Sequence, residues 1–454
     1  MLCPCAAGPA LHRASRPSFS AANIRGFTEI AHVAYLLAAG QTRPPGNLGG
    51  KCGWNEVYFL SASGIRAIRP ACCFKTHSRL RRSTLKYPPT AASELETKLA
   101  RVRLLLERHA LDALLVRRAD NFAWLTCGAA SHINLADSCG AAALLVTPAR
   151  RHVLTNNIEA PRLQQEEGLA GQGWDFHVVP WHTEALALAD FTRGLKLGVD
   201  HANGEAVDLT AELVPLRLAL LPQESARFEL LGKLVADTMD AAARSVRPGQ
   251  TEFEIAASLA SAALSRGVDP IVNLIATDER IHAYRHPLPS ARVMQRYAML
   301  VLCGRKWGLV CSITRLVHFG RLPDDLRRKA HALAQVDARF IVATRPGRTL
   351  GQIFKAGTDA YAAVGFADEW HLHHQGGSAG YAPREVVAAP DTPDQVAVGQ
   401  AFAWNPSITG TKSEDTILVG PDQNTIITAI SGWPAIKVSI DGQEMERPSI
   451  LEVT

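Results

Sequence analysis

The sequence predicts a mixed α/β fold, and three observations support this prediction. From Ala91 onward, capped helices with apolar positions on one face alternate with short apolar strands. The 454 residues are enough for two or three domains, each with its own hydrophobic core. The hydrophobic share of 47% and charged share of 20% are typical of a globular protein. Because no unbroken apolar run approaches about 18 residues, we expect no membrane partner.

The first ninety residues differ from the rest in charge. Residues 1–90 carry 12 Lys and Arg against two acids, Glu29 and Glu56, so their formal charge is +10, whereas that of the whole chain is +5. The remaining residues therefore carry about −5 (5 − 10), and we expect no nucleic-acid partner. We interpret 1–90 as a disordered tail or the product of a mis-assigned start codon. An organellar transit peptide is the alternative.

The cysteines divide at the same place. Five of the nine lie within residues 1–90, and the others are Cys127, Cys139, Cys303 and Cys311. They form neither CxxC pairs nor a regular disulfide framework, which indicates a reducing compartment. We expect a cytoplasmic protein, or an organellar one if the tail is a transit peptide.

Residues 91–222 predict a first α/β domain. A helix over Leu95–His109 opens it, and alternating short apolar segments follow, each closed by polar or turn residues. The predicted strands are Asp112–Val116, Asn121–Thr126, Ala141–Thr147 and Arg151–Thr155.

Residues 223–454 predict a second domain. A long helix over Glu224–Val246 begins after Pro222, and Pro248-Gly249 ends it. A second helix starts after Thr251, because Thr251 and Glu254 have capping-box spacing, and it ends at Gly267. Further helices are predicted over Pro323–Ala343 and Leu350–Val364. The predicted strands are Ile271–Ala276, Ala298–Cys303, Gly308–Thr314, Ala401–Trp404, Thr416–Val419 and Thr425–Ile430.

Five segments occur in order across the second domain: "RPGQTE", "RHPLP", "CSITR", "HHQGGSAGYAPRE" and "SEDTILV". They resemble the pita-bread domain of the creatinase and aminopeptidase P family, and the order of elements in residues 91–222 resembles the domain that precedes it there. The resemblance implies two helical pairs covering a curved antiparallel sheet. It also implies a homodimer in which one subunit's N-terminal domain lines the other subunit's site.

The resemblance implies a site for two divalent ions, held in metal-dependent members by two Asp, one His and two Glu. The matching positions here are Cys303 (or Val301), Ser312, Gly377, Asn405 and Glu414. Only Glu414 is such a ligand. Because four of the five ligands are replaced, we predict no metal cofactor, and a divalent ion (Mn, Zn or Co) only if the alignment of these segments is wrong.

The segment "HHQGGSAGYAPRE" resembles the metal-free version of this site in creatinase. The resemblance implies acid and base catalysis by His286 and His373, supported by Glu385 and Glu414. We interpret the neighbouring His371 and His374 as part of a solvated loop. The predicted substrate-binding residues are Arg384, Tyr381, Trp404 and Asn405. The implied reaction is hydrolysis of a C–N bond in a small amide, amidine or short peptide, with creatine itself disfavoured because Asn405 replaces a glutamate of creatinase.

Other functions remain open at this point. One is a metal-dependent Xaa-Pro aminopeptidase whose site is misaligned, and another is a catalytically silent binding protein. Gly376–Gly380 also has the spacing GxSxG, but it lacks the strand–turn–helix context of a nucleophile elbow around Ser378. Cys303 and Cys311 are candidate thiol nucleophiles, although a cysteine in a strand is usually inert packing.

Overall fold

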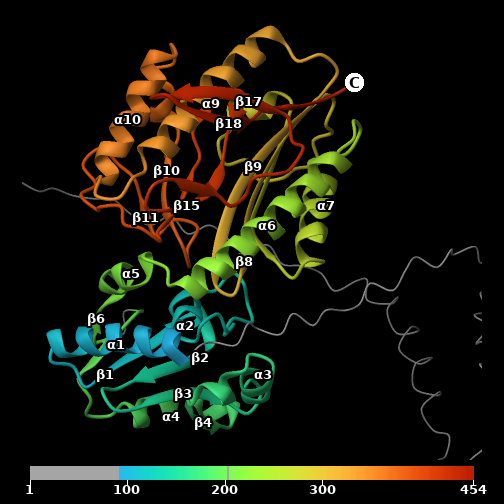
Figure 1. Ribbon diagram of the computed structural model, residues 1–454. Helices are drawn as coiled ribbons and strands as arrows, with labels where there is room; N and C mark the ends of the chain where they lie inside the picture. Colours follow the sequence, from blue (N-terminus) through green and yellow to red (C-terminus); the bar gives the residue numbers. More distant parts are fainter. Residues whose placement is uncertain (1–91, 202–203) are drawn as a thin grey trace, which may run out of the picture. The chain divides into compact units, whose positions relative to one another are not determined.

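Figure 1 shows the computed structural model, in which residues 92–201 and 204–454 are described. The mixed α/β fold is confirmed within these residues. The interpretation of residues 1–90 lies outside them. None of the helices in the two described ranges combines the length and apolar character needed to span a membrane.

The first part of the described chain forms one six-stranded mixed sheet in the order β4-β3-β2-β1-β5-β6. Its strands are β1 (Ala113–Arg118), β2 (Cys139–Val146), β3 (Arg151–Asn156), β4 (Asp175–Val179), β5 (Leu197–Val199) and β6 (Val207–Asp208). The helices are α1 (Ala92–Arg108), α2 (Ala119–Leu125), α3 (Ala160–Gln165), α4 (Glu184–Phe191) and α5 (Thr210–Leu218). One face of α1 is buried because Leu95, Leu99, Val102 and Leu106 recur at helical spacing.

One predicted strand of this part is wrong. Residues 121–126 fall mainly in helix α2, which ends at Leu125. All five residues from Asn121 to Leu125 are buried, so their burial lacks the two-residue period of a half-exposed strand. The hydroxyl of Thr126 donates to the carbonyl of Phe122, one helical turn back. Apolar residues facing every direction carried no periodic signal that separates a buried helix from a strand.

The second part contains two main sheets. In the first, β7 (Asp269–Thr277), β8 (Tyr297–Lys306) and β9 (Leu309–Phe319) pair antiparallel, and β19 (Leu451–Val453) adds a parallel edge. The second has the order β11-β10-β12-β15-β16 and is antiparallel. Its strands are β10 (Gly376–Ala379), β11 (Val386–Val387), β12 (Ala401–Trp404), β15 (Asp415–Val419) and β16 (Asn424–Ile426). An isolated bridge between Thr314 and Glu414 joins the two sheets.

Two pairs of helices pack on these sheets, as predicted. Helices α6 (Pro222–Ser245) and α7 (Glu252–Leu264) contact the sheet of β7, β8 and β9. Helices α9 (Asp324–Ala343) and α10 (Leu350–Ala363) pack together beside the second sheet and the hairpin of β17 (Ala435–Ile440) and β18 (Gln443–Pro448) (Figure 1). The predicted capping box of α7 is confirmed, because the Thr251 hydroxyl accepts from the Glu254 backbone N–H and the Glu254 carboxylate accepts from the Thr251 N–H.

The strand predicted over Thr425–Ile430 is too long at its C-terminal end. It ends at Ile426, and Thr428 turns inward instead. The Thr428 hydroxyl donates to the Asp415 carboxylate and accepts from the backbone N–H of Thr416. These side-chain hydrogen bonds replace the ladder at this point, which strand propensity does not reveal.

Buried ion pairs connect α1 with α6. Lys98 lies 2.7 Å from Glu94 and 2.8 Å from Glu224, and Arg227 lies 2.6 Å from Glu94. The Tyr381 hydroxyl donates to Glu224 at 2.6 Å. Buried charges of this kind need partners on all sides, so this network holds the first helix against α6.

Candidate active site

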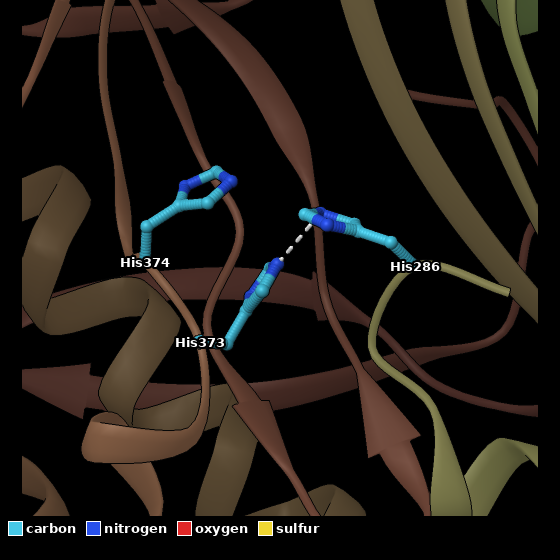
Figure 2. Close-up of side chains that lie close together, drawn as sticks. All are labelled: His286, His373 and His374. Carbon is cyan, nitrogen blue, oxygen red and sulfur yellow. Dashed lines mark hydrogen bonds between the residues drawn. The ribbon is translucent and has the colours of Figure 1, made fainter. Parts of the chain in front are cut away.

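Two predicted catalytic histidines lie in contact. The Nε2 atoms of His286 and His373 are 3.0 Å apart, joined by a hydrogen bond whose donor depends on the tautomer (Figure 2). The ring of His374 is also close, with its centroid 4.5 Å from that of His373 and 5.5 Å from that of His286. We call these three residues the histidine cluster. His374 was interpreted as a solvated loop residue, and the structure instead brings it to the other two.

Two loops supply the cluster. His286 follows the short helix α8 (Glu279–Ala283), and His373 and His374 follow the 3₁₀ turn Glu369–Leu372 and precede β10. Buried Gln375 anchors the second loop, because its amide donates to the carbonyls of Trp370 and His373 and accepts from the Tyr361 hydroxyl. Satisfying a buried amide on three sides gives this loop one conformation.

A group of charged side chains around Glu414 lies near the histidine cluster. Glu414 itself is 2% exposed. One carboxylate oxygen accepts from Arg384 at 2.9 Å. The other accepts from the Thr314 hydroxyl at 2.6 Å and lies 3.3 Å from the Lys412 ammonium. Burial alone would raise the pKa of Glu414, but Lys412 and Arg384 outweigh it and hold the pKa at about 2. One carboxylate therefore faces two cations, which leaves an excess of one positive charge.

The imidazoles are electrically neutral near pH 7. Burial, followed by the Lys412 charge, lowers the pKa of His373 to about 2. Burial and the Arg384 charge lower the pKa of His374 to about 4. The same two kinds of cause lower the pKa of His286. Each ring therefore carries one proton and one lone pair, and the hydrogen bond between His286 and His373 uses the proton of one Nε2 and the lone pair of the other.

The structure places Cys303 and Ser312 side by side. They are opposite one another on β8 and β9, and their side chains are 3.2 Å apart. Arg384 donates to Ser312 at 3.1 Å as well as to Glu414. Burial raises the pKa of Cys303 to about 11, so its thiol stays protonated and is a poor nucleophile.

Gly377, which the resemblance aligns with the family's metal-binding histidine, has no room for a side chain. A Cβ atom on Gly377 would lie 2.0 Å from the carbonyl oxygen of Val386 and 2.9 Å from the backbone nitrogen of Ala388. Both neighbours are backbone atoms of the adjoining strand region, so they cannot rotate away. This excludes a histidine here without movement of the sheet.

We therefore expect Gly377→Ala to lower the free energy of unfolding by at least about 2 kcal/mol, because the clash is with backbone. Gly171→Ala is the matched control, since a Cβ there meets no atom within 4 Å. The control should change stability by less than about 1 kcal/mol. Chemical denaturation measures both, and equal stabilities of the two variants would contradict the crowding at Gly377.

The family's pair of metal ions does not fit these residues. The single carboxylate in the set, Glu414, already has both oxygens bonded to Arg384, Thr314 and Lys412. Arg384 joins Glu414 to Ser312, so a guanidinium links two of the five ligand positions. Two divalent ions beside two cations and one carboxylate would lack charge compensation.

Three other predicted site residues have structural partners instead. Glu385 accepts from Arg217 at 2.6 Å with one oxygen and from the backbone N–H groups of Tyr381 and Ala382 with the other, so it has none left for the imidazoles. Tyr381 belongs to the buried ion network of α1 and α6. Trp404 is fully buried, stacks on Phe340 with centroids 4.8 Å apart and donates to Thr344. In the structure these three side chains have packing and ion-pair partners, which nothing in the sequence distinguished from a binding role.

Two further positions bear on the earlier alternatives. Asn405 is 2% exposed, and its side-chain oxygen has no hydrogen-bond partner among the described residues, which leaves it available to a ligand. Ser378 lies inside strand β10, and its hydroxyl accepts from the backbone N–H of Val386. A strand interior is not a nucleophile elbow, so the GxSxG spacing has no catalytic context.

Lys412 was missed by sequence reasoning. Its side chain is 4% exposed and pairs with Glu414, and its charge lowers the pKa of all three imidazoles. A lysine two residues before the retained Glu414 was visible in "TKSEDTILV". A lone lysine in a strand pattern normally indicates an exposed face, so its burial was not predictable.

Comparison with known proteins identifies the fold of both parts. The family model "Metallopeptidase family M24" matches residues 227–421, and "Creatinase/Prolidase N-terminal domain" matches residues 98–216. The chain belongs to the creatinase and aminopeptidase P family. This confirms the resemblance inferred from the sequence, and family and fold together support a hydrolase-like function for this member.

Solved structures of similar fold include a prolidase from Pyrococcus horikoshii, 16% identical, with a TM-score of 0.64 over 75% of this chain and 99% of the other. An Xaa-Pro dipeptidase from Bacillus anthracis is 17% identical, with a TM-score of 0.63 over 79% and 100%. The N-terminal domain of FACT complex subunit SPT16 from chickpea is 14% identical, with a TM-score of 0.54 over 75% and 97%. A curated relative, agropine synthesis cyclase of Rhizobium rhizogenes, is 24% identical over 299 residues, which is 56% of this chain and 75% of the relative.

Proposed function

We propose that this family member hydrolyses a C–N bond in a small substrate without the family's metal pair, using the histidine cluster for proton transfer. The observation that carries the proposal is the contact between the Nε2 atoms of His286 and His373 at 3.0 Å, beside a cationic group formed by Arg384 and Lys412. Adjacent neutral imidazoles can accept one proton and donate another, which is what hydrolysis requires.

The two histidines have different parts in this proposal. His286 is exposed, so its ring can meet substrate and water, whereas His373 is 8% exposed. A water that attacks the C–N carbon loses one proton, and the leaving nitrogen gains one, so the ring that takes the first can return the second. Their hydrogen bond lets His373 orient the His286 ring during both transfers.

The charges favour an anionic substrate. Glu414 is already paired with Arg384 and Lys412, so it offers no free carboxylate to a guanidinium or amidinium group. The excess positive charge favours a substrate that carries a carboxylate near its C–N bond. Asn405, with its unpartnered buried oxygen, supplies a hydrogen-bond acceptor for the substrate's N–H. We therefore favour carboxylate-bearing amides, short peptides included, over the amidines that the sequence also allowed.

The test is a hydrolysis screen of the full chain against carboxylate-bearing amides, Xaa-Pro dipeptides and neutral or cationic amidines, each with and without a chelator. We expect turnover of an anionic amide that persists in the chelator. Loss of all activity in the chelator, with recovery on Mn²⁺ or Co²⁺, would instead support the metal-dependent aminopeptidase.

A second candidate comes from the curated relative. Because it is named a cyclase, the same proton-transfer groups are also suited to ring closure within one substrate molecule. The screen separates the two reactions by product mass, since hydrolysis adds one water and dehydrating closure removes one. A protein that binds substrates and turns over none would be the silent binding protein. The fold also occurs in a subunit of the FACT complex.

A further inference from the structure

We propose that His286, His373 and His374 form a binding site for one divalent transition-metal ion, separate from the positions that hold the family's ion pair. Each residue offers one ring nitrogen, and the three atoms lie within 4.8 Å of one another. None of the three residues matches a metal-ligand position of the family, where Gly377 stands in place of the histidine.

The spacing suits a tetrahedral ion. Zinc–nitrogen bonds of about 2.0–2.1 Å at tetrahedral angles place two ligand nitrogens about 3.3 Å apart. The two Nε2 atoms of His286 and His373 are 3.0 Å apart, so they need to separate by only a few tenths of an ångström. Figure 2 shows the His374 ring beside those of His286 and His373. His374 is exposed, so a side-chain rotation can bring its nitrogen the remaining distance.

The chemistry of the donors selects the ion. Three neutral imidazoles match zinc, copper or nickel, whereas manganese, magnesium and calcium prefer carboxylate and carbonyl oxygens. Because the rings are neutral near pH 7, binding need release no net proton, but the ring whose Nε2 donates the hydrogen bond has to move its proton to Nδ1. Three protein ligands would leave the fourth position open to water.

The surrounding charges act on affinity. Lys412 and Arg384 repel a cation, and Glu414 attracts it. Together these three side chains carry one net positive charge, which lowers the affinity for a cation. Replacing Lys412 with a neutral residue should therefore raise the zinc affinity. Zinc bound elsewhere on the chain, away from Lys412, would keep its affinity.

The site also has a consequence for turnover, and this part rests on the proposed function. An ion bound to His286 and His373 occupies the lone pairs that would accept the proton from water. Zinc should then inhibit hydrolysis, and a chelator should restore it.

Binding is tested by isothermal titration of the full, chelator-stripped chain with ZnCl₂ and, separately, MnCl₂. We expect one equivalent of zinc to bind and manganese not to bind at the same concentrations. Cobalt(II) chloride should give the intense visible absorption of a tetrahedral ion. His286→Ala, His373→Ala and His374→Ala should each weaken zinc by at least about tenfold.

His371→Ala is the matched control, since His371 lies in the same segment, stacks on Trp370 and is outside the cluster. It should bind zinc as the unmodified chain does. Zinc held by the triple histidine variant belongs to other ligands, such as the N-terminal cysteines, and is subtracted. Circular dichroism checks that each variant is folded.

Zinc affinity that is unchanged in all three single variants, or no zinc binding at all, would overturn the site. Failure of the proposed function is separate, because titration measures no turnover. A chain that binds zinc through these histidines and hydrolyses nothing keeps the site and loses the hydrolase.

Discussion

Replacing His286 with alanine is expected to lower kcat for the C–N substrate by about a hundredfold or more, because loss of a general acid–base group typically costs that much. His286 is the exposed ring of the pair and contacts His373 at 3.0 Å. KM should change less than kcat, since the substrate's anionic group is expected to bind at Arg384 and Lys412. Steady-state kinetics in the presence of chelator measures both constants.

Two variants make this prediction specific. His373→Ala should also lower kcat, because His286 would lose the partner that orients its ring. His371→Ala should leave both constants unchanged. If His286→Ala and His371→Ala gave the same kcat, proton transfer would have to be assigned to other groups, and the proposed function would lose its main support.

Replacing Arg447 with methionine is expected to lower the free energy of unfolding by about 3–5 kcal/mol. Arg447 is 1% exposed, donates to Asp337 of α9 at 2.8 Å and donates to Asp415 of β15 at 2.6 Å. Both carboxylates are buried, so removal of the guanidinium leaves charge without compensation. Asp415 retains Arg315, 2.8 Å away, and the larger loss falls on Asp337.

The matched control is Arg339→Met. Arg339 also pairs with an aspartate, Asp441, but that partner's side chain is 62% exposed. Exposed ion pairs contribute about 0–1 kcal/mol, so this variant should remain close to the unmodified chain. Chemical denaturation compares the two variants, and equal losses would show that burial of the Arg447 network has no special energetic weight.

The Arg447 network also bears on the candidate site. Asp415 directly follows Glu414, and Arg315 follows Thr314, which donates to Glu414. Side chains from β9, α9 and β18 therefore hold the segment Ser413–Asp415 that contains Glu414. Loss of Arg447 should disturb the site as well as stability, and sequence reasoning did not find this residue.

Local patterns in the sequence were sufficient to predict most of the regular elements. Capping at Thr251, the apolar face of α1 and the paired strands around Cys303 and Ser312 are local patterns, and the structure has each of them. Local hydrogen bonds and periodic burial decide such features, so neighbouring residues suffice to predict them. The replacement of carboxylates at the family's ligand positions stays a prediction from the resemblance.

Which polar side chains share a site depends on tertiary packing. Lys412 and Arg384 are both polar residues in the sequence, but only packing shows that both pair with buried Glu414. Packing also paired Glu385 with Arg217 and brought His374 to the other two imidazoles. A charge finds its partner through space, often from an element a hundred residues away, and burial then makes that pairing energetically decisive.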